Sequence, residues 1–446
     1  MRKRDSVSEK KVLKTSSLWD HHGHLSLLGA KFEKVNLSKI FSPEKLYEIL
    51  KKEASRSKKG GDWIFGCGLN ISLWKNRNCD LETLDKITPD NPVFLERIDA
   101  HSAVVNTFAL KLAGLNPKNK EEGGFFEKEK GKLTGGIVDS LVEKVSRAFS
   151  EPDLELIEKR LKKAVLELKR NFLSGATDMM ISEDESKVLQ EMDLENKLEI
   201  PILGYLKWSK DCNLPSFLYK GKKYCEEGIK VFLDGALGSR GAALKSPYSD
   251  EPNNCGVLLL DKKEIYELLK ECNKKNVNVA FHIIGDRALD NFIEAVEKFA
   301  DLKIKIRAEH LQITPIPLLE RLRKTDVIFS LQPCHYLSDK KWAEQRIGKE
   351  RMSCSYLLRS VISQRKNFLF GTDFPIEPID PRRTLKGCFE RKKEERIPIS
   401  KILYGMKAPK QFFKYSKPCL ISFELKSNNS EKHLSEVGIK YINDAK

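Results

Sequence analysis

The sequence predicts an α/β fold, a (β/α)8 barrel of the TIM type with a large insertion after its first strand. From about residue 175 onward, short apolar runs alternate with longer amphipathic segments, which is typical of a parallel sheet flanked by helices. Eight such runs can be counted along the chain, which is the number of strands in this barrel. No GxGxxG motif follows any of them, which disfavours an open dinucleotide-binding sheet.

The expected strands follow in chain order. The first is the run SLW immediately before Asp20. The other seven are expected at 177–181, 200–206, 229–233, 277–282, 304–310, 326–332 and 367–373. Apolar residues at helical spacing predict helices between the later strands, at 261–276, 287–300 and 315–325.

The chain divides into three segments. Residues 1–15 are a basic amino-terminal segment, residues 16–400 form the barrel, and residues 401–446 form a polar tail with one strand-like run, PCLISFEL. Within the barrel, the interval 30–175 breaks the alternation and ends in a charged helix near 151–172. We expect this interval to be an insertion that covers the mouth of the barrel.

Composition excludes several classes of protein. Hydrophobic residues make up 40% of the chain, which is enough for a folded core. There is no run of 18 apolar residues, and the basic amino terminus lacks the apolar core of a signal peptide, so we expect a cytoplasmic protein with no membrane partner. The ten cysteines contain no CxxC pair, which indicates reduced thiols.

The formal net charge of +16 leaves two interpretations. An anionic partner such as nucleic acid is one. However, lysines are interleaved with acidic residues, as in LKKAVLELKR, which is typical of solvated helix faces and makes nucleic-acid binding the less favoured interpretation. A small-molecule substrate is the expected partner, and a homo-oligomer stays open.

Histidines gather near the start of the barrel, in the run DHHGHL. On an extended chain His22 and His24 point to the same side, while His21 points away. A pair of imidazoles at a strand end is a natural beginning of a metal site, although clustered histidines also occur on surfaces.

Three further expected strands end in residues of the same chemistry, His282, His310 and Asp373. The carboxyl ends of barrel strands converge on one mouth, so these residues should meet the first pair there. Each histidine alone is more simply a hydrogen-bonded core residue, and only the repetition favours a site. His335, after the seventh strand, is a candidate for substrate contact.

Seven ordered blocks of the chain resemble the amidohydrolase superfamily and, within it, the amidohydrolase family 3 branch of YtcJ-like metal-dependent hydrolases. The resemblance covers roughly residues 16 to 385. The blocks are DHHGHL, ERIDAHSAVVNTFALKLAGL, GIKVFLDGALGSRGAALKSPYSD, VAFHIIGDRALD, RAEHLQI, SLQPCH and GTDFPIEP. Family members begin with strands of a small β-sandwich, for which this chain offers only some fifteen residues, so we expect a reduced or vestigial small β domain.

The resemblance assigns metal ligands to five residues, namely His22, His24, His282, His310 and Asp373. It matches Lys230 to a lysine that is carbamylated and bridges two metal ions. A carbamate is an anionic oxygen ligand, whereas an ammonium group has no lone pair to offer. The alternative for Lys230 is an ordinary lysine whose stem lies beside the strand.

Other residues near these motifs are open to two interpretations. Arg97, His101 and Asn106 resemble a block that roofs the active site and would suit a carbonyl or carboxylate substrate, or they form a hydrogen-bonded loop. Asp234 either supports a ligand histidine or caps the glycine-rich turn that follows it. Glu309 precedes His310 and is expected to point to the outer side of its strand.

The predicted function is a metal-dependent hydrolase that cleaves the C–N bond of an amide or formamide-like substrate with metal-activated water. Asp373 is expected to act as the proton acceptor. Zinc is the first choice for one or two bound ions, and manganese, iron or nickel would also fit. The alternatives are a mononuclear deaminase, which needs no carbamate on Lys230, and a barrel that binds an anion without turnover.

Overall fold

The computed structural model forms two units, which are described separately. Unit 1 consists of Met1–Gly29 and Leu154–Lys446, and unit 2 of Ala30–Asp153. The structure describes residues 7–16, 18–57, 62–71, 74, 79–97, 102–119, 124–149, 151–299, 302–363, 367–415, 418–428 and 431–441.

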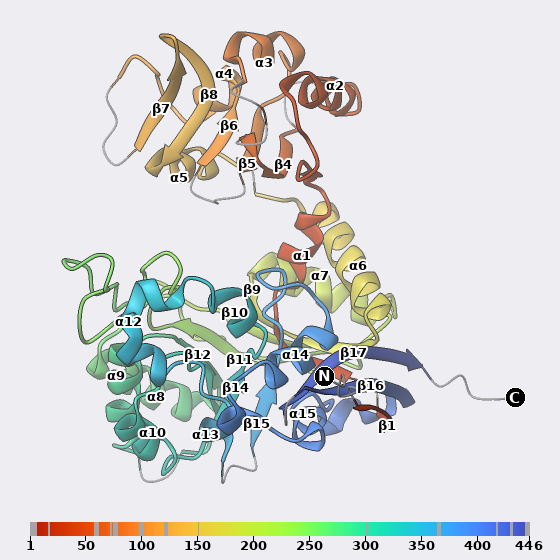
Figure 1. Cartoon of the computed structure of the whole chain (residues 1–446), viewed down its shortest axis with the longest axis vertical. Coiled ribbons are helices and arrows are strands. Elements are labelled where there is room, and N and C mark those ends of the chain that lie inside the picture. Colours follow the sequence, from red (N-terminus) through yellow and green to blue (C-terminus); the bar gives the residue numbers. More distant parts are fainter. Residues whose placement is uncertain are drawn as a thin grey trace, which may run out of the picture. The chain divides into compact units, whose positions relative to one another are not determined.

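A nearly closed barrel of eight parallel strands forms the centre of unit 1 (Figure 1). In spatial order the strands are β15 (Phe368–Phe370), β14 (Val327–Leu331), β13 (Ile306–His310), β12 (Asn278–Ile283), β11 (Tyr224–Phe232), β10 (Ile202–Lys207), β9 (Leu173–Ile181) and β2 (Leu18–Gly23). Closure between β15 and β2 uses the segment just after β15. The backbone amide of Asp373 donates to the carbonyl of His22 at 2.7 Å, and that of His24 donates to the carbonyl of Phe374 at 2.8 Å.

Helices alternate with these strands and cover the barrel. They are α1 (Leu25–Lys31), α6 (Leu154–Arg170), α7 (Glu183–Leu194), α8 (Lys262–Lys275), α9 (Asp286–Val296), α10 (Ile316–Leu322), α11 (His335–Asp339), α12 (Ala343–Ser353), α13 (Arg359–Ile362), α14 (Pro381–Phe389), α15 (Ile399–Gly405) and the 3-10 helices η2 (Lys393–Glu395) and η3 (Lys410–Tyr415). One continuous apolar core joins the outer faces of the strands to these helices. Its fully buried members include Ile229 and Val279 in strands and Leu269 and Phe292 in helices. This core fixes where the strand ends lie.

The structure contains all eight predicted barrel strands, but several boundaries differ. Strand β2 continues to Gly23, β9 begins at Leu173, and β15 is only Phe368–Phe370, so that Asp373 lies just beyond the end of its strand. Strand β11 begins at Tyr224, five residues before the apolar run suggested, because its first half includes Glu226 and Glu227. The predicted insertion 30–175 is longer than unit 2, since α6 packs Leu161 and Val165 into the core of the barrel. The charged appearance of α6 reflects only its solvent face.

Unit 2 is a mixed six-stranded sheet with helices. The strand order is β3 (Val35–Asn36), β4 (Ile64–Leu69), β5 (Val93–Arg97), β6 (Ser102–Val105), β8 (Lys132–Asp139) and β7 (Gly124–Glu129). The helices are α2 (Pro43–Ala54), α3 (Leu81–Ile87), α4 (Thr107–Leu112) and α5 (Ser140–Ser146). Two apolar clusters pack its helices on the sheet, so unit 2 has a core of its own.

The two ends of the chain meet in a small antiparallel sheet. Strand β1 (Val7–Ser16) pairs with β16 (Pro418–Asn428), which pairs with β17 (Glu431–Tyr441). The predicted segment 1–15 is therefore mostly strand backbone, for which its charged residues gave no apolar pattern. The small β element combines segments from both ends of the sequence and has three strands in the part of the chain that is described. That it is a reduced form of a larger β domain stays a prediction.

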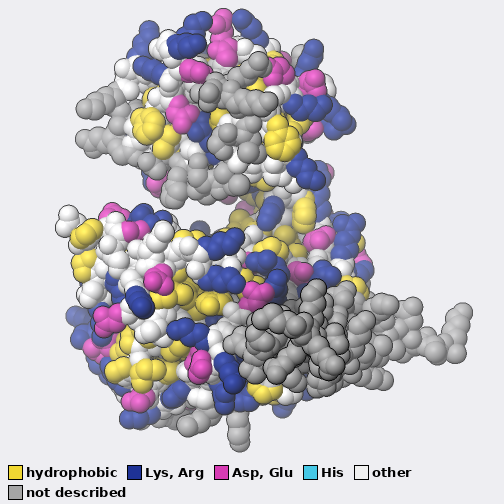
Figure 2. All heavy atoms as spheres, in the orientation of Figure 1, with side chains coloured by type: hydrophobic (Ala, Val, Ile, Leu, Met, Phe, Trp, Pro, Cys, Tyr) yellow, Lys and Arg dark blue, Asp and Glu magenta, His cyan; other side chains and the backbone are white. Residues whose placement is uncertain are grey.

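The surface agrees with the interleaved charges of the sequence. On the face drawn in Figure 2, Lys and Arg side chains are interspersed with Asp and Glu rather than collected in one area. Among the described residues, no helix is both long and apolar enough to cross a membrane. Nine of the ten cysteines have side chains that the structure describes, and these nine are free thiols.

Candidate active site

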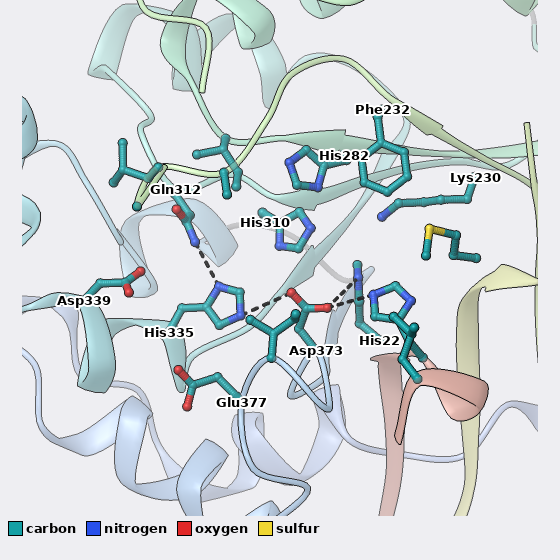
Figure 3. Close-up of a pocket in the computed structure, with 18 of the residues that line it drawn as sticks. His22, Lys230, Phe232, His282, His310, Gln312, His335, Asp339, Asp373 and Glu377 are labelled. Carbon is teal, nitrogen blue, oxygen red and sulfur yellow. Dashed lines mark hydrogen bonds and ion pairs between the residues drawn. The ribbon is translucent and has the colours of Figure 1, made fainter. Parts of the chain in front are cut away.

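A cavity of about 420 Å³ opens at the carboxyl ends of the barrel strands and is lined by the predicted residues (Figure 3). Six predicted metal ligands and one predicted substrate contact take part. They are His22, His24, Lys230, His282, His310, Asp373 and His335. These side chains come from positions spread over about 350 residues of sequence, and parallel strand register brings them together.

The imidazoles of His22 and His24 face the carboxylate of Asp373. His24 Nε2 lies 3.0 Å and His22 Nε2 lies 3.4 Å from Asp373 Oδ1. Two ligands of a tetrahedral zinc ion, each bonded at about 2.0 Å, are separated by roughly 3.3 Å. The spacing of this trio therefore fits a divalent ion held by these three side chains, which also form one of two clusters with metal-ligating spacing among the described residues.

The protonation of these groups suits a cation. Burial lowers the pKa of His22 to about 4, so the ring is neutral and has a lone pair to give. Burial raises the pKa of Asp373, but the nearby imidazoles, His22 first, outweigh it and hold that pKa well below its usual value. A carboxylate and neutral imidazoles at one point are the ligand chemistry that zinc prefers.

The other cluster with metal-ligating spacing consists of His310, His335 and Asp373. A further group beside these residues consists of His282, His310 and Lys230. The rings of His282 and His310 are 4.4 Å apart between centroids. His282 Nε2, His310 Nδ1 and Lys230 Nζ are buried, and none has a hydrogen-bond partner among the described residues. Burial also lowers the pKa of Lys230 to about 8. Three polar atoms without partners indicate space for a group that would satisfy them.

The bounds of strand β11 explain how Lys230 reaches the other predicted ligands. The apolar run alone placed this lysine at the start of its strand, far from the other strand ends. Because β11 runs from Tyr224 to Phe232, Lys230 is two residues from its carboxyl end and its Nζ lies 5.4 Å from the Phe232 ring centroid. It lines the same cavity as the histidines.

The predicted outward orientation of Glu309 is wrong. Its side chain is fully buried inside the barrel, where Oε2 lies 2.6 Å from His22 Nδ1 and Oε1 accepts a 2.7 Å hydrogen bond from Arg307 Nε. Alternation would place neighbouring residues on opposite faces, but His310 has a φ of +73°. This left-handed backbone turns His310 toward the mouth while Glu309 keeps the inward position.

Glu309 fixes the orientation of the His22 ring. Burial raises the pKa of Glu309, but the Arg307 guanidinium and His22 outweigh it and hold the pKa below its usual range, so the group is a carboxylate. The Glu309 carboxylate accepts a hydrogen bond from His22 Nδ1–H. This keeps the proton on Nδ1 and leaves the unprotonated Nε2 facing Asp373. This support was missed in the sequence because no pattern signals a positive φ at a histidine.

Asp20 is a second supporting residue without a predicted role. Its carboxylate accepts hydrogen bonds from the His22 amide at 3.1 Å and from the Thr372 amide and hydroxyl at 3.0 and 2.7 Å. It thus ties β2 to the segment that carries Asp373. Asp373 itself has a φ of +64°, and these bonds hold the backbone in that conformation.

His335 contacts the other oxygen of the central carboxylate. Its Nε2 lies 3.3 Å from Asp373 Oδ2, and its Nδ1 lies 2.9 Å from Gln312 Nε2 (Figure 3). Burial lowers the pKa of His335, but the nearby Asp373 carboxylate outweighs it and raises that pKa above its usual value. His335 can therefore carry a proton beside Asp373, a role different from that of the neutral rings.

Of the two interpretations of Asp234, the contacts favour the one in which it stabilises the loop that follows it. Its carboxylate accepts from the amides of Ala243, Ile284 and Gly285, at 3.0, 3.1 and 2.7 Å. The nearest histidine atom, His282 Nε2, is 3.8 Å away, beyond hydrogen-bond distance. Asp234 thus fastens the loop after β11 to the end of β12.

The residues predicted from the insertion belong to unit 2. The Arg97 guanidinium makes a two-pronged ion pair with Glu127. Asn106 is buried, caps α4 and binds the backbone of Thr88 and Asn91, which is the hydrogen-bonded loop interpretation. His101 lies outside the described residues. The predicted contact of Arg97 and His101 with substrate stays a prediction.

The remaining wall of the cavity is mostly apolar, with Gln312 and two acidic residues. Its large apolar members are Leu27, Met180, Phe232, Leu237, Ile284, Trp342 and Ile376. The acidic members, Asp339 and Glu377, were not singled out in the sequence. Glu377 is paired with Arg383 at 2.7 Å, and Asp339 accepts a hydrogen bond from the Tyr356 hydroxyl at 2.8 Å.

A parallel α/β barrel with imidazoles and a carboxylate gathered at the carboxyl ends of its strands defines the class of metal-dependent hydrolases. The chain belongs to the amidohydrolase family, whose model matches residues 17–406. The family membership predicted from the seven sequence blocks is confirmed, and with it a general hydrolase function.

Relatives agree with this assignment. "Protein LONG AFTER FAR-RED 3" of Arabidopsis thaliana is 29% identical over 84% of this chain and 68% of its own length. "Putative amidohydrolase YtcJ" of Bacillus subtilis (strain 168) is 29% identical over 84% of this chain and 72% of its length. "N-substituted formamide deformylase" of Arthrobacter pascens is 23% identical over 65% and 57%.

A solved structure has the same architecture. The crystal structure of an "uncharacterized metal-dependent hydrolase" from Pyrococcus furiosus is 28% identical to this chain. It superposes with a TM-score of 0.76 and covers 97% of this chain and 88% of that one. The barrel is therefore a shared fold.

Proposed function

We propose that this hydrolase cleaves the C–N bond of an amide or formamide-like small molecule with the help of a divalent metal ion. The observation that carries the proposal is the contact of one carboxylate, Asp373, with the imidazoles of His22, His24 and His335 inside a cavity of about 420 Å³. The Arthrobacter pascens relative is named N-substituted formamide deformylase, and this name supports the substrate class.

His22, His24 and Asp373 would hold the ion, and zinc is the first choice for an imidazole and carboxylate set. A bound divalent ion lowers the pKa of water to near neutrality and polarises a carbonyl oxygen. Glu309 keeps the lone pair of His22 Nε2 directed at the site.

Asp373 is the proposed proton carrier. As an ionised carboxylate it accepts the proton of the attacking water and delivers it to the leaving nitrogen, so that no charge accumulates on the amine. His335, which lies on Asp373 Oδ2, donates a hydrogen bond to the carboxylate or to the substrate carbonyl oxygen.

Lys230, His282 and His310 would hold a second ion if Lys230 is carbamylated. The neutral amine adds to carbon dioxide, the new N–C bond gives a carbamate, and one proton is released to solvent. A pKa of about 8 makes the neutral amine accessible near physiological pH, and the unpartnered Nζ has room for the added group. The carbamate would then supply two anionic oxygens.

The test combines metal analysis with a substrate panel. Protein loaded with zinc, manganese, iron or nickel is measured by mass spectrometry for metal content and incubated with N-substituted formamides and simple amides. We expect one to two ions per chain, and amine release that stops when a chelator removes the metal. Metal-loaded protein inactive on the whole panel would refute the substrate class. Ammonia release from a ring amine, with one ion and unmodified Lys230, would identify the deaminase alternative.

A further inference from the structure

A second cavity, of about 450 Å³, lies in the barrel unit at the end opposite the histidine cluster. Its lining residues come from the beginnings of strands, such as Leu203 in β10, Ile328 in β14 and Phe368 in β15. The segment 404–413, at and after the end of α15, supplies the other side. The two cavities share no lining residue, so this is a separate site. We call it the lower cavity, and we call the cavity lined by the histidines the upper cavity.

The charged residues of this cavity are mostly cations. Arg307, with a side chain only 3% exposed, lines its floor, and Lys305, Lys407 and Lys410 lie around it. The single carboxylate among the lining residues, Glu227, is engaged by Lys305 at 2.8 Å. Since Lys305 is paired with Glu227 and Arg307 with Glu309, Lys407 and Lys410 are the lining cations that have no carboxylate partner among the described residues, and these two favour an anionic occupant.

Aromatic side chains make up much of the remaining wall. Tyr205 is buried, with its ring centroid 5.2 Å from the Arg307 guanidinium carbon. Tyr404 and Phe413 line the cavity and are 52% and 40% exposed, so their rings are accessible to a ligand. A cavity of a few hundred Å³ with an aromatic wall and a few convergent polar groups is typical of a site for a small ligand.

Arg307 connects this cavity to the candidate active site. Its Nη2 donates to the carbonyl of His21 at 2.8 Å and to the Ser330 hydroxyl at 2.9 Å, and its Nε donates to Glu309 at 2.7 Å. Glu309 in turn contacts His22 at 2.6 Å. The guanidinium that lines the lower cavity is thus two hydrogen bonds away from an imidazole of the upper one.

We propose that the lower cavity binds a small organic anion, one anionic oxygen group on an aromatic body, and that its occupancy changes metal affinity at His22 through Arg307 and Glu309. The anionic group lies among Arg307, Lys407 and Lys410, and the aromatic body lies against Tyr404 and Phe413. By thermodynamic reciprocity, metal bound in the mouth changes the affinity of the lower cavity for the anion by the same factor.

Titration calorimetry of the full chain with benzoate and, separately, with phenyl phosphate tests the site. We expect one-site binding of at least one probe, and the stronger of the two identifies the anionic group as carboxylate or phosphate. In the variant Lys407→Gln/Lys410→Gln the affinity should fall by about tenfold or more, since two cationic contacts are lost. The control Lys401→Gln/Lys414→Gln removes two exposed lysines that do not line the cavity and should bind like the parent chain.

Two results would overturn the site, namely no binding of either probe at millimolar concentration, or equal binding by both double variants. The connection is tested by zinc competition against a chromophoric chelator, with and without saturating probe. A zinc affinity that changes with the probe in the parent chain, and not in Lys407→Gln/Lys410→Gln, supports it. An unchanged zinc affinity with the probe bound would overturn the connection through Arg307.

Discussion

Replacing Glu309 by Gln tests the support of the metal site without removing a ligand. The carboxylate is fully buried between Arg307 and His22, whose side chains are 3% and 1% exposed. Glutamine keeps the shape but leaves the Arg307 cation without its partner, and breaking a buried pair in this way costs roughly 3–5 kcal/mol of folding stability. Loss of such a support to a metal-binding histidine also weakens metal affinity by roughly 10- to 100-fold.

Urea unfolding of the metal-free protein measures the first effect, and zinc competition with a chromophoric chelator measures the second. Glu226→Gln is the matched control, because Glu226 is also a buried carboxylate of the barrel but bonds to Ser186 and Tyr224 and does not line the cavity. We expect both variants to lose stability and only Glu309→Gln to lose zinc affinity. Unchanged zinc affinity in folded Glu309→Gln would show that Glu309 does not orient His22.

Four other predictions concern the site directly. Asp373→Asn should lower the turnover number by roughly 100-fold or more with little change in fold, measured by steady-state kinetics and circular dichroism, and near-normal turnover would assign the proton transfer elsewhere. The His22→Ala/His24→Ala variant should stay folded but lose most bound metal by mass spectrometry, and full occupancy would remove strand β2 from the site. Lys230→Ala should be nearly inactive and partly rescued by short carboxylic acids, and normal activity with both ions bound would refute a carbamate. In the parent chain, burial lowers the pKa of Lys230 to about 8, so at fixed dissolved carbon dioxide its carbamylation, followed by mass, should be roughly fifty-fold faster at pH 8 than at pH 6, where the amine is protonated.

The barrel could be predicted from the sequence because its strands contain short apolar runs, and several of these runs end at or near a histidine or an aspartate. His282 and His310 illustrate this, since period-two alternation and strand ends are local properties of the chain. The side-chain direction of Glu309 could not be predicted in the same way, because the positive φ of His310 breaks the alternation. No neighbouring glycine in the sequence indicates this backbone conformation.

Strand β1 was missed for a related reason, and helix α6 was expected near 151–172 but was assigned to the insertion. Strand β1 has a charged sequence, and its partner β16 is some 400 residues away, so only long-range pairing identifies it. Helix α6 has one buried stripe under many charges, and its membership of the barrel depends on which surface that stripe contacts. Charge along a segment describes its solvent face and gives no information on its partner.

The helices on either side of unit 2 in the sequence touch each other. Gly29 of α1 packs so closely on α6 that a Cβ there would lie 2.2 Å from the carbonyl oxygen of Arg160. The chain therefore leaves the barrel and returns to it at neighbouring points, and the intervening residues form a sheet with its own core. An inserted segment of this kind can be lengthened, replaced or lost in evolution without interrupting a barrel strand. Descendants of one ancestor can therefore keep the same barrel while the segment between α1 and α6 changes.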